Sequence, residues 1–430
     1  MNRNVIQNSL DWIEDHLQTD ITAQDLADRA GFSLFHYYRL FHTYTGMPVM
    51  QYILQRRLLH AIYAVKNGEK RVNAALRYGF DTYAGFYRAF VREFGCTPSA
   101  YLKSKRVKRP VSVDVTKEEN MRLTHSLARE VLKHWQMENE TVADRYYESS
   151  GNLAQQAVKV GECMLLKRTQ NEAALESTLL FGDKLQEAGA AVETVILTGD
   201  GRRFVTKDNW HYMLCRQPEG RVMAALDMYG ADRVSKARYT GEIIGQLHLL
   251  LRQIKADVKE SNLLETVREW ALPQTKMLLH LPDTFCERFL KMFERLYPHL
   301  PQQVIHRNLN PSVILASEDG WGMVDFEMAE WSIRLFDPCY AATAVLSESF
   351  EACGEGKRKE WLDIYRSILV GYDSAAKLTE AEREAAPCVV LANQMICVAW
   401  LATQPQYAEI YETNRRMTRW LAERFDQLKL

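Results

Sequence analysis

Two carboxylates stand two residues apart in the segment Val324-Asp325-Phe326-Glu327, directly after an apolar run. Carboxylate oxygens are the ligands that Mg²⁺ prefers, and an acidic pair also attracts organic cations. A second polar segment, residues 304–315, precedes them and contains His306 and Asn308. The acidic pair could attract a cationic small molecule, such as an amine or amino sugar, or equally bind metal plus nucleotide.

The elements that must position these residues are strands followed by helices. Apolar runs predict three strands, at residues 161–167, 191–197 and 210–216. A helix is expected at residues 172–188, and helices dominate from Ser235 onward, with Gly241–Leu251 the clearest. Only residues 304–327 interrupt them. The pattern indicates an α+β domain with a mixed first part and a helical second part.

This order resembles the aminoglycoside phosphotransferase and choline kinase branch of the protein-kinase-like fold, over roughly residues 145–425. The resemblance implies a bilobal domain in which Lys167 grips nucleotide phosphates and Glu176 is its partner on the helix. It also implies that Asp325 and Glu327 bind metal. For Lys167, an ordinary surface lysine at a strand end is the alternative.

Further positions match the same family. Residues 213–217 fall at the hinge between the lobes, and Asp337 fits the carboxylate that braces the catalytic loop. His248 closes a helix with the family's Leu-His pair, but we expect it to be a hydrogen-bonded core histidine.

The catalytic loop departs from the family pattern H-x-D-x-x-x-x-N, because the aligned residues are His306, Asn308 and Val313. In the family, the Asp orients the acceptor hydroxyl or takes its proton, and the Asn holds magnesium. Asn308 is a neutral amide and cannot act as a base, and Val313 has no oxygen for a metal. The phosphate loop, residues 149–152, holds only one glycine. These losses predict that the domain has no catalytic residue and is a pseudokinase that binds a ligand. Asp325 and Glu327 could still hold one cation. Mg²⁺ and a nucleotide are therefore the candidate cofactors.

A duplicated pattern occupies the first hundred residues. Gly31-Phe32 recurs as Gly79-Phe80, and Tyr38-Arg39-Leu40-Phe41 recurs as Tyr87-Arg88-Ala89-Phe90. Each copy has a glycine that permits a left-handed turn, followed by a Ser or Thr that caps the next helix. Thr22 to Asp25 forms a capping box ahead of the first turn. Helix, glycine turn and helix make up a helix-turn-helix.

This region resembles the AraC-type DNA-binding domain, including the closing segment FGCTPSAYLK at residues 94–103. The resemblance implies two helix-turn-helix units joined by a linker helix, with recognition helices at residues 33–44 and 82–93 in successive major grooves. The candidate DNA contacts are Ser33, Leu34, His36, Arg39, Thr82, Tyr83, Tyr87 and Arg88. A surface ion pair is the alternative for either arginine. The spacing favours a buried position for Phe35, Leu40, Phe41, Phe86 and Phe90.

The charge is divided along the chain. Residues 1–110 contain 16 Lys and Arg against 9 Asp and Glu, which leaves 38 basic and 46 acidic residues for the remainder. The basic part suits a polyanion, and chance segregation is the alternative. The basic run at residues 103–110 is either a DNA-backbone contact or a solvated linker. Eight cysteines without metal spacing favour reduced thiols in a cytoplasmic protein, and no segment is expected to span a membrane.

The sequence therefore predicts a multidomain protein, with an all-α double helix-turn-helix domain ahead of an α+β protein-kinase-like domain. The expected boundaries are 1–107 for DNA binding, 108–144 for a linker with a helix, 145–218 for the N-lobe and 219–430 for the C-lobe. The favoured function is a transcriptional regulator that binds double-stranded DNA and senses a small-molecule effector, either cationic or a nucleotide. An active small-molecule phosphotransferase and a scaffold that only forms a homodimer are the alternatives.

Overall fold

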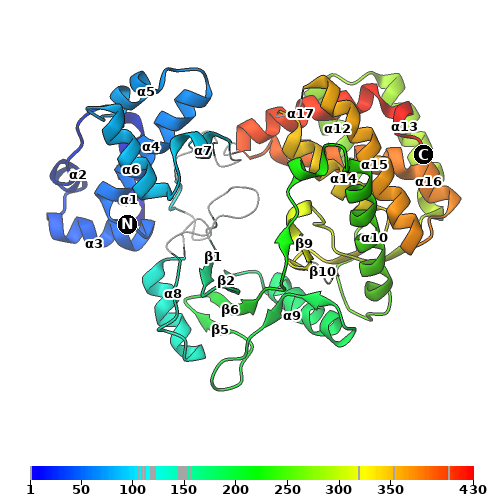
Figure 1. The fold of residues 1–430 in the computed structure, drawn as a ribbon, viewed down its shortest axis with the longest axis horizontal. Coiled ribbons are helices and arrows are strands. Elements are labelled where there is room, and N and C mark those ends of the chain that lie inside the picture. Colours follow the sequence, from blue (N-terminus) through cyan, green and yellow to red (C-terminus); the bar gives the residue numbers. More distant parts are fainter. Residues whose placement is uncertain are drawn as a thin grey trace. The chain divides into compact units, whose positions relative to one another are not determined.

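The computed structural model describes residues 2–103, 107, 110, 113–116, 123–143, 154, 156–317, 320–351, 354–404 and 407–430 (Figure 1). The chain forms two compact units. The first contains Met1–Gln170 and Ile196–Leu214, and the second contains Asn171–Val195 and Cys215–Leu430. The sequence expectation for the phosphate loop, residues 149–152, lies outside the described residues.

The first unit begins with the helices of the duplicated pattern, drawn in blue in Figure 1: α1 (Asn2–His16), α2 (Ala23–Ala30), α3 (Leu34–Thr45), α4 (Val49–Lys66), α5 (Arg71–Arg77), α6 (Tyr83–Phe94) and α7 (Pro98–Lys103). Thr22 and Asp25 form the expected capping box at the start of α2. Gly31 and Gly79 adopt φ values of 70° and 80°, which only glycine reaches without strain. Both predicted helix-turn-helix units are present.

One face of each recognition helix is buried. The buried side chains of α3 are Tyr37, Phe41 and Thr45, and those of α6 are Phe86, Phe90 and Phe94. The prediction that Phe35 is buried was wrong, because this side chain is 80% exposed. Leu40, also expected to be buried, is only partly buried.

A buried ion network ties α1 to the linker helix α4. Both oxygens of Glu14 accept hydrogen bonds from the guanidinium of Arg56, with 2.8 Å between Arg56 Nη2 and Glu14 Oε2. His60 Nε2 lies 3.1 Å from Glu14 Oε2. The carboxylate is therefore held between two basic side chains of α4, which fixes the linker helix against the first helix.

Val113 and Val115 lie against α1. The side-chain amide of Gln7 donates to Val113 O at 3.0 Å and accepts from Val115 N at 2.7 Å. Val107 and Val115 are buried in the same core as the helices. Residues 113–116 form no strand, although one was expected from Val111 to Val115.

The rest of the first unit has its own hydrophobic core. It contains α8 (His125–Leu132), β1 (Ala157–Val160), β2 (Met164–Thr169), β5 (Val205–Lys207) and most of β6 (Trp210–Arg216). The strand order is β1-β2-β6, and β5 pairs with β6 in antiparallel fashion. The strand expected at residues 161–167 starts later, because Gly161 begins the turn between β1 and β2 with φ of 56°.

The second unit consists of short strands and many helices. Its helices are α9 (Glu172–Glu187), α10 (Arg233–Leu251), α11 (Leu263–Thr266), α12 (Leu272–Leu279), α13 (Asp283–Leu296), α14 (Phe336–Ser349), α15 (Glu355–Ala375), α16 (Glu380–Leu401) and α17 (Ala408–Glu423). Its strands are β3 (Ala191–Val192), β4 (Thr194–Val195), β7 (Arg221–Val222), β8 (Gln302–Ile305), β9 (Ile314–Ser317), β10 (Gly320–Met323) and β11 (Glu330–Ile333). The single strand expected at 191–197 is thus two shorter strands. Strand β4 pairs with the last two residues of β6.

Two small sheets hold the polar segments of the second unit. One has the order β3-β10-β9-β7, with β3 parallel to β10 and the other pairs antiparallel. The other is the antiparallel pair of β8 and β11. The segment between β8 and β9 and the segment between β10 and β11 carry the predicted site residues.

Helices α10 and α15 cross at unusually close range because glycines face the contact. A Cβ on Gly241 would lie 1.9 Å from Ile368 O, and one on Gly371 would lie 2.0 Å from Arg238 O. No side chain fits at either distance. The crossing positions His248, which lies on the same helix α10.

Helix α16 passes the length and composition test for a membrane span, and among the described residues it is the only helix that does. Of its apolar window, 78% is buried inside the protein. A core helix meets the same test.

Candidate functional site

The predicted DNA-contact residues lie on α3 and α6 or at their first residues. Ser33 and Thr82 are the N-caps, accepting from His36 N at 3.4 Å and from Gly85 N at 3.1 Å. Along the two helices, Arg39, Tyr87 and Arg88 are exposed, whereas Leu34, His36 and Tyr83 are half-buried. All eight candidates are thus at least partly exposed, as a contact surface requires.

The arginines of this surface have no acidic partner. Arg39 Nη2 lies 3.4 Å from His36 Nδ1, and among the described side chains neither Arg39 nor Arg88 pairs with a carboxylate. The surface ion pair considered as the alternative is therefore absent from the described part of this region. Both guanidinium groups remain available for a phosphate.

Phe35 is a candidate that the spacing argument misplaced. It is the second residue of α3, and its ring is exposed beside the half-buried His36. The corresponding residue of the second copy is Ala84, so the two recognition helices present different side chains at this position.

Asp337, at the start of α14, holds the catalytic-loop segment through hydrogen bonds to its main chain. Asp337 is fully buried and accepts from His306 N at 2.8 Å and from Arg307 N at 3.0 Å. Arg307 has a φ of 71°, a left-handed conformation that a side chain rarely adopts and that the two hydrogen bonds stabilise. The sequence prediction for Asp337 is confirmed in its geometry.

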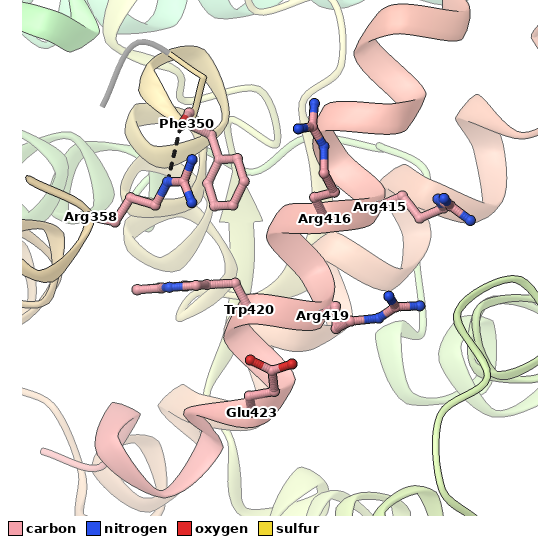
Figure 2. A pocket seen from close by; sticks show the side chains of 7 residues that line it. All are labelled: Phe350, Arg358, Arg415, Arg416, Arg419, Trp420 and Glu423. Carbon is pink, nitrogen blue, oxygen red and sulfur yellow. Dashed lines mark hydrogen bonds between the residues drawn. The ribbon is translucent and has the colours of Figure 1, made fainter. Parts of the chain in front are cut away.

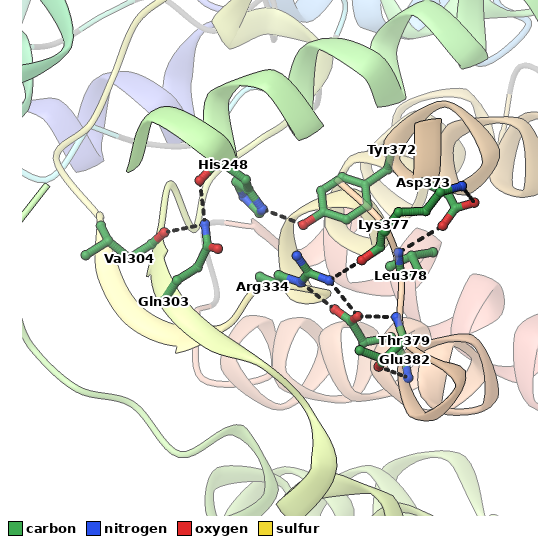
Figure 3. A network of polar contacts seen from close by, with 10 residues as sticks. All are labelled: His248, Gln303, Val304, Arg334, Tyr372, Asp373, Lys377, Leu378, Thr379 and Glu382. Carbon is green, nitrogen blue, oxygen red and sulfur yellow. Dashed lines mark hydrogen bonds and ion pairs between the residues drawn. The ribbon is translucent and has the colours of Figure 1, made fainter. Parts of the chain in front are cut away.

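A buried polar network connects Asp337 to helices α10 and α15, and Figure 3 shows its members His248 and Tyr372. His248 lies 3.0 Å from Asp337 Oδ2 and 2.9 Å from the hydroxyl of Tyr372, so it is the hydrogen-bonded core histidine that was expected. Its main-chain carbonyl accepts from the side chain of Gln303. Burial raises the pKa of Tyr372 well above its ordinary value, so this hydroxyl remains a neutral donor.

A second part of the network joins the start of α16 to the loop before α14. The guanidinium of Arg334 forms two hydrogen bonds of 2.8 Å with Glu382, which is fully buried. Thr379 and Glu382 form a capping box, so the same carboxylate also fixes the helix end (Figure 3). The hydrogen bonds to Glu382 raise the pKa of Arg334. Asp337 and Glu382, both fully buried, therefore hold the segments beneath the loop through hydrogen bonds.

Asn308 is bonded directly to Asp325, and this contact is the centre of the site. Its amide nitrogen donates to Asp325 Oδ2 at 3.1 Å, while its oxygen accepts from Tyr340 and Asn310, each at 3.3 Å. Three of the four hydrogen bonds that the amide can make are therefore supplied by the protein. Burial raises the pKa of Tyr340 to about 12, so its hydroxyl donates at neutral pH.

Val313 stands at the position where the resemblance implies a metal-binding Asn. Its side chain is buried in the hydrophobic core, and its main-chain carbonyl accepts from Val324 N at 3.1 Å. The side chain offers no oxygen. The lost metal ligand has thus been replaced by apolar packing.

The segment from Asp325 to Glu327 is held against α9. Asp325 has φ of 71°, and Phe326 O accepts a hydrogen bond of 2.6 Å from Ser177. Both Asp325 and Glu327 are half-buried, whereas Glu176, one residue before Ser177, is exposed. Lys167 lies in the first unit on β2 and Glu176 in the second unit on α9, so their pairing stays a prediction.

Asp325 and Glu327 are the two carboxylates of this segment that could bind a cation. Among the described residues, no group of three or more His, Cys, Asp or Glu side chains could surround a metal. The oxygens left are those of Asp325 and Glu327, and Asp325 already accepts from Asn308. Mg²⁺ is usually held by one or two carboxylates together with water and phosphate oxygens, so the binding of one cation by Asp325 and Glu327 stays a prediction.

The fold defines a kinase-like α+β domain that follows a duplicated helix-turn-helix in the chain. Two family models match the chain: "Helix-turn-helix domain" at residues 26–104 and "Phosphotransferase enzyme family" at residues 163–377. The chain belongs to the phosphotransferase enzyme family and carries an AraC-type helix-turn-helix domain at its N-terminal end.

Similar proteins match one part of the chain or the other. The uncharacterized HTH-type transcriptional regulator YbfP of Bacillus subtilis is 36% identical over 97 residues, which are 22% of this chain and only 33% of that protein. The transposon Tn10 TetD protein of Escherichia coli is 36% identical over 102 residues, 24% of this chain and 74% of that protein. The structure of a microcompartment-associated aminopropanol kinase covers 70% of this chain and 97% of its own, with a TM-score of 0.51 and 16% identity, which establishes the fold alone.

Proposed function

We propose that this protein is a sequence-specific DNA-binding transcriptional regulator whose phosphotransferase-like domain senses a small molecule and transfers no phosphate. The observation that carries the proposal is the hydrogen bond of 3.1 Å between Asn308 and Asp325. The resemblance to the family places a catalytic Asp where Asn308 stands. An amide in that position holds the metal-site carboxylate directly.

Two carboxylates at this separation would require a cation between them. Unit charges about 4 Å apart repel by ~4 kcal/mol at an effective dielectric constant of 20, which Mg²⁺ offsets in an active kinase. The amide removes the repulsion and supplies a hydrogen bond instead. The apo site is therefore stable without metal, which suits a binding domain.

The same substitution removes the proton acceptor. General-base catalysis typically contributes ~10²–10⁴ in rate, and a neutral amide contributes none of it. The buried side chain of Val313 removes a second metal ligand. Loss of both groups supports a domain that binds a ligand and leaves it chemically unchanged.

The acidic pair favours a cationic ligand. Asp325 and Glu327 are half-buried, and a partly desolvated carboxylate attracts an ammonium group more strongly than an exposed one. An amine or amino sugar satisfies this charge without metal. A nucleotide would need Mg²⁺ to approach the same carboxylates, so the amine is the preferred effector class.

The helix-turn-helix repeat supports DNA binding by its charge and by its exposed side chains. Residues 1–110 carry an excess of basic over acidic residues, and Arg39 and Arg88 occupy equivalent positions of the two copies. Phe35 adds an apolar contact suited to the methyl group of thymine. A DNA-binding role agrees with the expected cytoplasmic location, and a homodimer would present two such heads.

Sensing requires that the ligand prefer one of two states with different DNA affinity. A change of tenfold in DNA affinity corresponds to about 1.4 kcal/mol of coupling free energy. One hydrogen bond to a charged group, about 1.5–3 kcal/mol, is enough to supply it. The effector therefore needs few differential contacts.

Phosphate transfer from ATP tests the proposal directly. We expect the full chain to release no product with ATP, Mg²⁺ and a panel of amines and amino sugars, while amines shift its melting temperature. Brisk ATP-dependent phosphorylation of any of these acceptors would overturn the proposal in favour of an active kinase. A tight dimer that responds to no ligand would overturn it in favour of a scaffold.

The variant Asn308→Asp tests the geometry behind it. The new carboxylate should repel Asp325, lower the melting temperature and make it rise again with Mg²⁺, whereas the wild-type melting temperature should not respond. Asn262→Asp is the matched control, because Asn262 caps α11 through its side-chain oxygen and Asp caps equally well. An equal Mg²⁺ response of wild type and Asn308→Asp would contradict the role given to the amide.

A further inference from the structure

Two side chains of the linker helix α4, Arg57 and His60, contact both halves of the DNA-binding domain. The halves are the first subdomain, α1 to α3, and the second subdomain, α5 to α7. Arg57 and His60 are three positions apart, so they lie on one face of α4 about one turn from each other. Both are half-buried, whereas Arg56 is buried. Each of the two touches one subdomain on one side and the other subdomain on the other side.

Arg57 binds the end of the first helix. Its Nε donates to Leu17 O at 2.9 Å, and its Nη2 donates to Thr19 O. Leu17 directly follows the last residue of α1, where main-chain carbonyls have no partner within a helix. A guanidinium is favourable at this end because the helix dipole is negative there. Two hydrogen bonds from one planar group also fix the direction of the side chain.

The third nitrogen of the same guanidinium lies against the turn of the second subdomain. A Cβ placed on Gly79 would lie 3.1 Å from Arg57 Nη1 and 3.2 Å from its Cζ. The equivalent glycine of the first copy, Gly31, would meet nothing within 4 Å. Both glycines have a positive φ, 80° and 70°, so the two turns share a backbone conformation and differ in their neighbours. The second turn is packed onto Arg57, whereas the first is open at this point.

His60 makes the same kind of bridge one turn further along α4. Its Nε2 lies 3.1 Å from Glu14 Oε2 in the first subdomain. The centre of its ring lies 5.6 Å from the centre of the Tyr78 ring, with the two planes 39° apart. Tyr78 is buried and directly precedes Gly79. The turn of the second subdomain therefore contacts both linker side chains, and each of these is also bonded to the first subdomain.

An arginine that binds the end of a helix also occurs in the second unit. Arg358 on α15 donates from Nε to the main-chain oxygen of Phe350, the residue that follows α14, at 3.1 Å (Figure 2). That bond joins two helices that are adjacent in the chain. Arg57 differs, because its guanidinium contacts two segments that are far apart in the sequence, at residues 17–19 and at Gly79. Its loss would change the placement of one subdomain against the other.

We propose that Arg57 and His60 are positioning residues that fix the distance and the rotation between α3 and α6, and so select the spacing of the two DNA half-sites. The inference rests on the proposed function, because it applies to DNA that both subdomains contact. One inserted base pair shifts a half-site by about 3.4 Å along the duplex and rotates it by roughly 34°. Two subdomains held in one arrangement cannot follow that change without losing contacts at one half-site.

Selection from a pool of random duplex DNA with the full chain identifies the half-sites. Fluorescence anisotropy then compares the selected duplex with one that carries a single inserted base pair between the half-sites. We expect the insertion to weaken wild-type binding by about tenfold or more, which is the effect of losing one base contact. For Arg57→Met and for the double variant Arg57→Met/His60→Phe, we expect the insertion to weaken binding by no more than about threefold. Arg57→Lys, which keeps the charge but lacks the planar fork, should lie between wild type and Arg57→Met.

Gly79→Ala and Gly31→Ala are a matched pair. Both add a methyl group at a positive φ and carry the same backbone strain, but only the methyl group on Gly79 meets Arg57. We expect Gly79→Ala to lose discrimination against the insertion and Gly31→Ala to keep it. A variant that is merely unstable loses affinity for both duplexes alike, so the ratio of the two affinities separates positioning from loss of structure.

The outcomes distinguish this inference from the proposed function. A wild-type chain that enriches no sequence from the pool would overturn both. Wild-type binding that tolerates the insertion would overturn this inference alone. The same holds for a double variant that binds the selected duplex and discriminates against the insertion as strongly as wild type does, and for an equal loss of discrimination in Gly31→Ala and Gly79→Ala.

Discussion

The recognition helices and the catalytic-loop segment have both kept the backbone of their families, but they differ in what their side chains are bonded to. In the first unit, Arg39, Arg88 and Phe35 face outward, and the described part of the chain gives neither arginine an acidic partner. In the second unit, the amide of Asn308 is bonded to Asp325, Tyr340 and Asn310. The comparison teaches that a fold and its functional side chains can be retained separately. The exposed arginines of the recognition helices can still bind a partner, whereas the amide of Asn308 makes most of its hydrogen bonds within the protein.

The largest effect is expected from the scaffold beneath the loop. Gly241→Ala would place a Cβ 1.9 Å from Ile368 O and force α10 away from α15, so we expect a loss of about 3 kcal/mol or more in the stability of the second unit. Thermal unfolding followed by circular dichroism measures it. Gly356→Ala, in the first turn of α15 with open space around it, should be neutral or slightly stabilising. Equal melting of the two variants would mean that the helix crossing does not support the loop.

The ion network of the first unit should produce the next largest effect. Burial raises the pKa of Glu14, but the hydrogen bonds from His60 and Arg56 lower it by more, so the pKa lies below its ordinary value of 4.5. This contribution to stability is therefore fully present above pH 4.5 and is lost as the pH falls through the lowered pKa of the folded state. Glu14→Gln leaves Arg56 buried without a charge partner and should lower the free energy of unfolding by about 3 kcal/mol at neutral pH.

Denaturant unfolding across a pH series checks this prediction. The acid-dependent loss should be smaller in Glu14→Gln than in wild type, since the variant has no carboxyl to protonate. Glu69→Gln, which removes an exposed pair with Arg77, should cost less than about 1 kcal/mol. Identical acid profiles of wild type and Glu14→Gln would show that the network does not stabilise the packing of α1 against α4.

Phe35→Ala sharpens the comparison on the DNA side. Apolar contact with a base edge carries sequence information, so the variant should lose about 1–3 kcal/mol on its preferred operator and almost nothing on random DNA. Fluorescence anisotropy with both fragments at fixed salt measures the two affinities. An equal loss on both fragments would assign Phe35 to the DNA backbone or to folding.

Arg88→Ala should have the smallest effect and the opposite pattern. A phosphate contact is independent of sequence, so binding to both fragments should weaken alike, by about 1 kcal/mol or less. The slope of log affinity against log salt should also fall by about one. Unchanged binding and slope would remove Arg88 from the interface and weaken the equivalence of the two copies.

Much of the fold could be predicted from local signals. The capping box at Thr22, the glycine turns and strand Trp210–Arg216 depend on neighbouring residues, and the structure has all of them. Phe35 was misplaced because an apolar residue was assigned to the stripe without tracing it around the helix. Tyr37 and Phe41 define the buried face, and a residue two positions before Tyr37 is turned by about 200°, which places it on the opposite face.

The candidate site was predictable in composition but not in geometry. The sequence gives the types of Asn308 and Asp325, yet the direction of the amide follows from the three-dimensional approach of two loops far apart in the chain. Only tertiary packing brings such residues together.

The hydrogen bonds of Gln7 to Val113 and Val115 determine where a minimal DNA-binding fragment can end. A fragment cut after Lys103, the last residue of α7, would lose Val107 and Val115 from the core and the hydrogen bonds between Gln7 and residues 113–115. Such a fragment would expose apolar surface, aggregate and unfold at a lower temperature. A fragment extended through Thr116 keeps Val107 and Val115 in the core and retains both hydrogen bonds of Gln7.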